Sequence, residues 1–194
     1  MKGNKGLNAD MTCRGLSPVQ TSGYESPAQT SGDYSPAQTI GDYSPAQTSG
    51  YGSAAQSICN GCAAQTSGYG SAAQTIGDYS PAQTIGDYSP AQSIGNHSPV
   101  QTSGYGSAAQ SIGNHSLAQT SGDGSIASAI GIESKACAKN GAIVIADWRY
   151  DSGKWTLHGV YSAMIGERIK SKVIEPDTWY WFEDGELKSE PLNK

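Results

Sequence analysis

Small apolar, amide and hydroxyl side chains alternate with a fixed period of nine residues over residues 17–133. The consensus copy reads Ser, Pro or Ala, Ala, Gln, Thr or Ser, Ser or Ile, Gly and two variable residues, and thirteen copies follow one another without insertion. A fixed period is typical of a solenoid, in which each unit buries its inner face by stacking on its neighbours. Nine extended residues span only about 30 Å, which is too short for two facing strands and two turns. One copy is therefore predicted to form half a coil.

The sixth position of the repeat separates odd-numbered from even-numbered copies. After the first copy, odd copies carry Ile there and even copies carry Ser, with Ile85 as the exception. The full repeat is then two copies long: an Ile-bearing strand, a turn, a Ser-bearing strand and a second turn. This pattern predicts an all-β fold, a parallel β-solenoid built as a two-sheet β-roll with an 18-residue coil. The isoleucines that define the ladder are Ile40, Ile58, Ile76, Ile94 and Ile112.

Other repeat positions agree with a narrow stacked coil. Position seven is Gly in every copy except at Cys59, as a turn with positive φ or a close backbone approach requires. Position three is Ala or Val, which predicts an interior filled by small side chains, and position four is Gln until Ser128, which predicts an amide ladder along the stack. Enrichment in Gly, Ser, Pro and Gln also suits a disordered chain, but the strict register favours order.

The face that the Ile ladder occupies depends on where the turn begins. Strand alternation places Ala of position three and Ile of position six on opposite faces, unless the turn starts between them. The preferred interpretation is an early turn, with the isoleucines in the core. In the alternative they form an exposed apolar stripe that needs a partner, most simply another copy of the chain.

The chain divides into three segments. Residues 1–16 are short, basic and non-periodic, residues 17–140 form the solenoid, and residues 141–194 hold all four tryptophans and the only phenylalanine. The first segment has no apolar run of the kind a secretory signal needs, and no stretch is long and apolar enough for a membrane span. We therefore expect no membrane contact and a location in the cytoplasm of a host bacterium, with a virion as the alternative.

The last segment is predicted to be a small antiparallel β cap. Residues 142–150 indicate a strand, residues 151–154 a hairpin turn and residues 155–161 the returning strand, while residues 178–182 followed by 183–186 indicate another strand and turn. An open solenoid end exposes unpaired backbone, so a capping element is expected. The aromatic residues are expected to form the core of this cap, and a sugar-binding or peptide-binding aromatic surface is the alternative. The tryptophans concerned are Trp148, Trp155, Trp179 and Trp181.

Charge limits the partners of the rod. Between residues 17 and 134 there are seven acidic residues and no Lys or Arg. Without cations the rod cannot displace counterions from a phosphate backbone, so nucleic-acid binding is not expected. The acids also keep a repetitive β-surface soluble and discourage pairing of strand edges.

Candidate chemistry is sparse. Cys59 and Cys62 have the spacing of a redox pair or of half a zinc site. They occupy the Gly and Ser positions of the repeat, so we interpret them as replacements of one small residue by another without a functional role. His97 and His115 are two repeat copies apart and should stack on adjacent coils. The sequence contains no nucleophile–base grouping and no phosphate loop. We therefore expect a non-catalytic protein with no cofactor and no metal.

One edge of the coil is the expected contact surface for a partner. Tyr51, Tyr69 and Tyr105 occupy position eight of even copies, where Asp87 interrupts their row. Tyrosine presents a large contact area at low entropic cost, so this edge, with its acids, is predicted to bind a protein partner; the alternative is that the rings cover neighbouring turns of a monomer. The acidic residues assigned to this surface are Asp33, Asp87 and Asp123.

The repeats and several further segments carry a resemblance to a known group of proteins. With residues 5–15, 125–136, 141–148 and 174–187, the chain resembles a family of nonapeptide-repeat β-solenoid proteins that is common in phages and prophages of gut bacteria. Longer members carry a globular N-terminal domain, which this chain lacks. The resemblance implies the fold and a phage context.

Three functions are then considered. The first is a phage-encoded binding protein that occupies a host factor through its anionic rod, either alone or as a homo-oligomer. The second is a structural or adhesive virion component, in which the rod extends from a fibre. The third is ice binding through a regular threonine ladder on the Ser-bearing sheet, and its members are Thr30, Thr48, Thr66, Thr84, Thr102 and Thr120.

Overall fold

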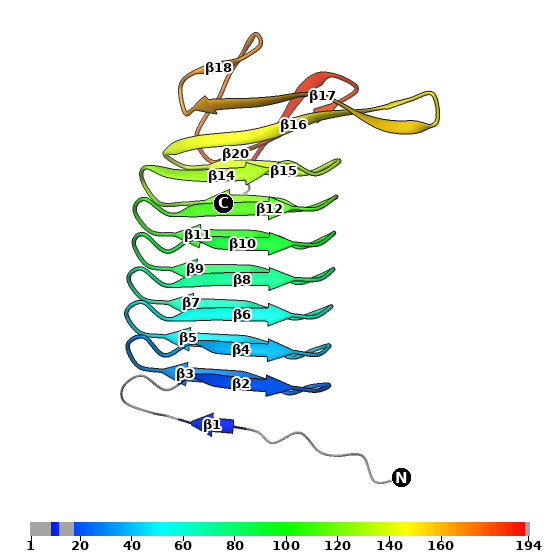
Figure 1. The fold of residues 1–194 in the computed structure, drawn as a ribbon. Helices are drawn as coiled ribbons and strands as arrows, with labels where there is room; N and C mark the ends of the chain where they lie inside the picture. The colour runs from blue at the N-terminus through cyan, green and yellow to red at the C-terminus, as the bar shows by residue number, and fades with distance from the viewer. Residues whose placement is uncertain (1–8, 12–17, 193–194) are drawn as a thin grey trace.

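The computed structural model describes residues 9–11 and 18–192, which form a β-solenoid closed by a small antiparallel cap. Two sheets run along the stack, and the chain passes from one to the other at every turn (Figure 1). Sheet A contains β1 (Ala9–Met11), β3 (Ala28–Ser31), β5 (Ala46–Ser49), β7 (Ala64–Ser67), β9 (Ala82–Ile85), β11 (Val100–Ser103), β13 (Leu117–Thr120) and β15 (Lys135–Ala138). Sheet B contains β2 (Val19–Ser22), β4 (Ala37–Ile40), β6 (Ala54–Ile58), β8 (Ala72–Ile76), β10 (Ala91–Ile94), β12 (Ala108–Ile112) and β14 (Ser125–Ala129).

The strands pair in parallel with like residue types facing each other. Residues 46–49 of β5 pair with residues 64–67 of β7, and residues 73–76 of β8 pair with residues 91–94 of β10. Each residue therefore faces its counterpart two repeat copies along the chain. The predicted two-sheet roll with an 18-residue coil is confirmed.

The interior of the rod is filled by small side chains, as the sequence predicts. Along β7, Ala64 and Thr66 are buried and Gln65 is exposed, because successive strand residues point to opposite faces. Ser of position one also points inward. The Ser89 hydroxyl donates to the Gly68 carbonyl at 2.8 Å and accepts from the Ser71 amide at 3.1 Å. This pattern recurs from coil to coil, so the inward-facing serine hydroxyls are hydrogen-bonded inside the rod. The buried hydroxyls of Thr48, Thr102 and Thr120 have no such partner among the described residues.

The preferred interpretation of the Ile ladder is wrong. Ile40, Ile76 and Ile94 are 44%, 37% and 38% exposed, and Ile58 and Ile112 are half-buried. The strand continues through position six before the turn begins, so the inward-facing Thr or Ser of position five forces the following Ile outward. The isoleucines form a stripe on the outer face of sheet B.

Where position seven is glycine, the short distance between coils leaves no room for a Cβ; Cys59 is the one residue at this position that carries a side chain. Gly68 has φ of 142°, and a Cβ placed on it would lie 2.2 Å from the Gly50 carbonyl oxygen of the preceding coil. Gly70, two residues later in the same turn, has φ of 66°, and a Cβ there would have open space around it. The first position therefore needs Gly for steric reasons, while the second needs only a residue that tolerates the left-handed conformation.

The N-terminal segment contains one strand of the stack. β1 pairs in parallel with β3, in the register of Ala9 with Ala28. The stack therefore begins within the first segment, at residues 9–11. Residues 1–8 and 12–16 lie outside the described residues.

The cap extends both sheets with antiparallel hairpins, as predicted. β16 continues sheet B in parallel with β14 and then turns back into β17, and β20 continues sheet A antiparallel to β15 (Figure 1). The pairing of β16 with β17 shifts register between Asp147 and Trp148. The cap strands are β16 (Gly141–Asp151), β17 (Lys154–Met164), β18 (Arg168–Ile169), β19 (Lys172–Val173), β20 (Thr178–Glu183) and β21 (Glu186–Pro191).

The tryptophans do not form the cap core, which corrects the sequence-based expectation. In β20, strand alternation places Tyr180 and Phe182 inward and Trp179 and Trp181 outward. Trp148, Trp179 and Trp181 are half-buried, and Trp155 is exposed. The buried side chains that replace them in the core are Ile143, Ile145, Ile169, Ile174, Tyr180 and Phe182.

A buried carboxylate ties the cap strands together. The Asp147 side chain is fully buried and accepts hydrogen bonds from Arg149 Nη2 at 2.7 Å and Nε at 3.2 Å, with Lys170 Nζ 3.8 Å away. The hydrogen bond from Arg149 lowers the pKa of Asp147 below its ordinary value, and the positive charges of Arg149 and Lys170 act in the same direction. The ion pair is therefore formed at neutral pH.

The two glycines of one turn provide a matched test of coil stacking. Gly68→Ala places a methyl group against a backbone carbonyl, so we expect it to lower the free energy of unfolding by about 3 kcal/mol or more. Gly70→Ala should lower the free energy of unfolding by only about 1 kcal/mol, which is the cost of holding a residue with a Cβ in the left-handed conformation. Chemical denaturation of both variants measures the difference. Equal losses would contradict the steric role of position seven.

Acid should weaken the cap through Asp147. Its lowered folded-state pKa contributes stability that is present above the unfolded pKa of about 3.9 and is lost as the pH falls through the folded value. Asp147→Asn should destabilise the protein by about 1–3 kcal/mol at neutral pH. The variant's melting temperature should also fall less steeply than that of the wild type as the pH is lowered below about 4. Thermal unfolding followed by tryptophan near-UV circular dichroism checks both effects, and parallel acid curves for the two proteins would contradict this role.

Candidate interaction surfaces

An unbroken row of tyrosines runs along the edge where sheet A turns into sheet B. The ring centroids of neighbouring members lie 5.4 to 5.6 Å apart, and every ring is about half exposed. We call this row the tyrosine edge, and its members are Tyr34, Tyr51, Tyr69, Tyr88 and Tyr105. Desolvation raises the pKa of Tyr34 above its ordinary value, and Tyr51 acts in the same direction, so the phenol is neutral at physiological pH.

Two different turn sequences place a ring in the same row. One turn reads Asp-Tyr, with Tyr88 at φ of 55°, and the other reads Tyr-Gly, with Tyr105 followed by Gly106 at φ of 64°. A Cβ on Gly106 would lie 3.0 Å from the Tyr88 ring, so glycine there leaves room for the ring of the preceding coil. Tyr88 thus fills the place where Asp87 was expected to interrupt the row. Sequence reasoning missed Tyr34 and Tyr88 because they stand at position nine. The replacement of Tyr-Gly by Asp-Tyr at positions eight and nine of some even copies is the signal that could have found them.

The acids assigned to this edge take part in the turns. The carboxylates of Asp33 and Asp87 accept hydrogen bonds from the backbone amides of Tyr51 and Tyr105 on the next coil, at 2.9 and 2.8 Å. Asp123 accepts from the Asn140 side chain at 3.3 Å. All three acids therefore lie in turns next to the tyrosines. The hydrogen bonds of Asp33 and Asp87 also link the turns of successive coils.

The opposite edge carries a shorter and interrupted aromatic row. Tyr79, His97 and His115 stack at 5.0 Å, whereas Gly61 breaks the row between them and Tyr43. The predicted stacking of the two histidines is confirmed. Position eight of this edge carries Asp or Asn, whose side chains accept backbone amides of the next coil; the members with this bond are Asp42, Asn60, Asp78, Asn96 and Asn114.

Cys59 and Cys62 form a disulfide across the turn between β6 and β7. Cys62 is fully buried and accepts the Ser44 amide in the place of the usual serine hydroxyl. The remaining cysteine that the structure describes, Cys137, is buried, and desolvation raises the pKa of its thiol to about 11. These environments favour structural roles over a nucleophilic thiolate.

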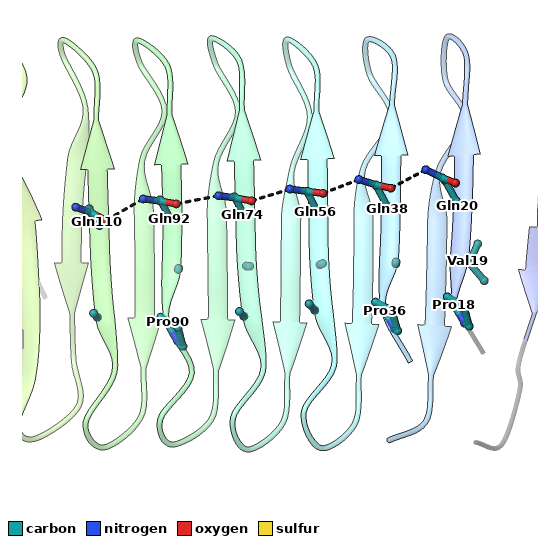
Figure 2. A pocket seen from close by; sticks show the side chains of 17 residues that line it. Pro18, Val19, Gln20, Pro36, Gln38, Gln56, Gln74, Pro90, Gln92 and Gln110 are labelled. Carbon is teal, nitrogen blue, oxygen red and sulfur yellow. Dashed lines mark hydrogen bonds between the residues drawn. The ribbon is translucent and has the colours of Figure 1, made fainter. Parts of the chain in front are cut away.

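A long shallow groove of about 670 Å³ runs along the outer face of sheet B (Figure 2). Its floor consists of position-three alanines, and one wall is a row of Pro and Ala residues at position two. The other wall is the predicted glutamine ladder, in which each amide nitrogen donates to the next amide oxygen at 2.6 to 2.9 Å. The ladder members are Gln20, Gln38, Gln56, Gln74, Gln92 and Gln110. Together with the Ile ladder, the groove makes a flat and uncharged face.

The threonine ladder is buried, which corrects the expectation of an exposed threonine array. Thr30, Thr66 and Thr84 are 3%, 3% and 1% exposed, and their hydroxyls donate to serine carbonyls inside the coil. The position-five side chain points inward because it shares a face with the Ala of position three. A buried hydroxyl cannot contact ice, so these residues provide no ice-binding surface.

Among the residues that the structure describes, no group of three or more His, Cys, Asp or Glu side chains is placed to hold a metal ion. Within the same residues, no helix long and apolar enough to cross a membrane occurs. No protein-family model, curated protein or solved structure matches the chain. The functional argument therefore rests on the surfaces of the rod and its cap.

Proposed function

We propose that this protein is a non-catalytic binding protein whose rod engages a protein partner through the tyrosine edge. The observation that carries the proposal is the continuity of the five rings, each in contact with its neighbour and each about half exposed. The row spans five coils, and the four steps of about 4.8 Å between them give it a length of about 20 Å. Tyrosine is enriched in protein interfaces because its ring offers a large contact area with few rotamers.

The surroundings of the edge favour a partner with a basic surface. Asp33 and Asp87 lie in turns of the tyrosine edge and Asp123 lies in the turn one coil beyond it, and residues 17–134 contain no Lys or Arg. The carboxylates would steer a basic partner toward the row and oppose an acidic one. The rings are already ordered by their neighbours, so binding immobilises few side chains. The chain resembles a family of phage proteins, so the proposed partner is a protein of the bacterial host. The rod would bind this protein in the bacterial cytoplasm and block its surface.

A matched pair of tyrosine variants tests this proposal. Tyr88 and Tyr43 have the same left-handed backbone and similar exposure, but only Tyr88 belongs to the tyrosine edge. Partners are captured from bacterial lysate with the wild-type rod, and their affinities for both variants are measured by interferometry. We expect Tyr88→Ala to weaken binding about tenfold or more and Tyr43→Ala to leave it unchanged. A partner that binds both variants equally, or the absence of any specific partner, would contradict the proposal.

The outer face of sheet B favours a second candidate, a structural component that assembles with copies of itself. Ile40, Ile76 and Ile94 project from a face whose glutamine amides are already paired along the ladder. Such a face has no charge to keep two rods apart, and burial of its apolar stripe would stabilise side-by-side association. In this candidate the rod forms part of a virion fibre.

The assembly candidate is tested by the solution mass of the wild-type protein and of the Ile76→Ser/Ile94→Ser variant. Light scattering should give a dimer or trimer for the wild type and a monomer for the variant. The circular dichroism should be unchanged, because both side chains lie outside the core. Ile85→Ser, on the outer face of sheet A, is the matched control and should keep the oligomer. A monomeric wild type would remove this candidate.

A further inference from the structure

The outward-facing tryptophans line a pocket where the cap meets the rod. The pocket has a volume of about 330 Å³, at the lower end of the range of about 300–1,000 Å³ for small-ligand sites. Its aromatic walls come from three strands: Trp148 of β16, Trp155 of β17 and Trp181 of β20. Neither the tyrosine edge nor the groove on sheet B contributes to it.

The chain already places one cation on these indoles. The Lys135 ammonium lies 3.9 Å from the centroid of the Trp181 ring and 3.7 Å from a Glu190 carboxylate oxygen. A cation over an indole face is attracted by the negative face of the ring, and Trp is the strongest aromatic partner for this interaction. Among the residues that the structure describes, no Lys or Arg lies over Trp148 or Trp155.

The charges around the pocket are complementary to a cation. Glu133, Glu183 and Asp184 line it together with Lys135, so the formal charge of its lining residues is −2. Glu133 lies 3.0 Å from His115, whereas Glu183 and Asp184 form no salt bridge with a described residue. The nearby cation Lys188 is instead paired directly with Glu186 at 2.6 Å; this hydrogen bond raises the pKa of Lys188, and the charges of Glu183 and Asp184 help to raise it further. Both of these side chains are exposed, one at the end of β20 and one in the turn that follows it. A ligand with a positive charge would gain from these carboxylates as well as from the rings, while a neutral sugar would gain only from the rings.

We propose that this pocket binds an organic cation, with the charged group held against Trp148 and Trp155 and with Glu183 and Asp184 as its counter-charges. A quaternary ammonium group and the guanidinium or ammonium group of a basic side chain share this chemistry. Lys135 stays on Trp181, where Glu190 holds it. Its charge opposes the ligand and limits the affinity of the native pocket.

The test uses choline and its neutral isostere 3,3-dimethyl-1-butanol, which have the same shape and differ in charge. The indole N–H resonances of the four tryptophans are followed during each titration of the full chain. We expect choline to shift the resonances of Trp148 and Trp155 with a dissociation constant of about 1 mM, and Trp179, outside the pocket, to stay unchanged. Acetyl-arginine amide forms a second arm, and tighter binding of it than of choline would identify a basic side chain as the source of the cation.

Variants separate the contribution of charge from that of shape. Trp155→Ala should weaken choline binding about two- to fivefold, because cation–ring contacts at exposed sites have about this effect. Glu183→Gln/Asp184→Asn should also weaken it, whereas Lys135→Met should strengthen it by removing a like charge. Trp179→Phe is the control, and its affinity should equal that of the wild type.

Three results would overturn the proposal. Equal binding of choline and the isostere would make the pocket a neutral apolar site. Binding of a neutral sugar such as N-acetylglucosamine in place of choline would assign it to carbohydrates. The absence of any shift at about 50 mM choline, well above the expected dissociation constant, would show that no cation site exists. The tyrosine edge is untouched by these variants, so failure here is distinguishable from failure of the proposed protein interface.

Discussion

The rest of the structure depends on stacking like coils in register at about 4.8 Å. At that distance the Gly68 Cα faces the Gly50 carbonyl so closely that no side chain fits between them, and the same contact recurs at position seven along the rod. The interior is correspondingly narrow and is filled by Ala, Ser and Thr. Most of the hydroxyls bond to backbone groups of the same or neighbouring coils, whereas those of Thr48, Thr102 and Thr120 have no hydrogen-bond partner among the described residues. Cohesion therefore comes from many small contacts and backbone ladders, with few large apolar side chains in the rod.

The same register creates the surfaces that we interpret as functional. A residue type that recurs at one position becomes a row, as the glutamines of the hydrogen-bonded ladder do. Asp-Tyr and Tyr-Gly turns bring tyrosines from two repeat positions into one row, the tyrosine edge. These rows are ordered before any partner arrives, which lowers the entropic cost of binding. Their length along the rod suits an extended protein partner.

The cap is where the periodicity ends and a different kind of surface becomes available. Its strands continue both sheets but reverse direction, and its hairpins carry large aromatic side chains that the narrow coils cannot hold. The buried carboxylate of Asp147 pairs with Arg149 on the same strand and with Lys170 from the turn between β18 and β19. The tryptophans that remain outside enclose a concave pocket beside three acids. The proposed contact surface and the proposed small-ligand site thus occupy different parts of one chain.

The sequence by itself determined the features that follow from period and turn chemistry: the 18-residue coil, the two sheets, glycine at the turns, the glutamine ladder and both cap hairpins. The tertiary structure decided which way individual side chains point. Whether Ile76 is core or surface depends on the residue at which the strand becomes a turn, and a period of nine is compatible with either. The equivalence of Tyr88 and Tyr105, at different repeat positions, and the outward tryptophans of β20 depend likewise on backbone conformation and sheet pairing. These are properties of neighbouring coils in contact, which no single copy of the repeat contains.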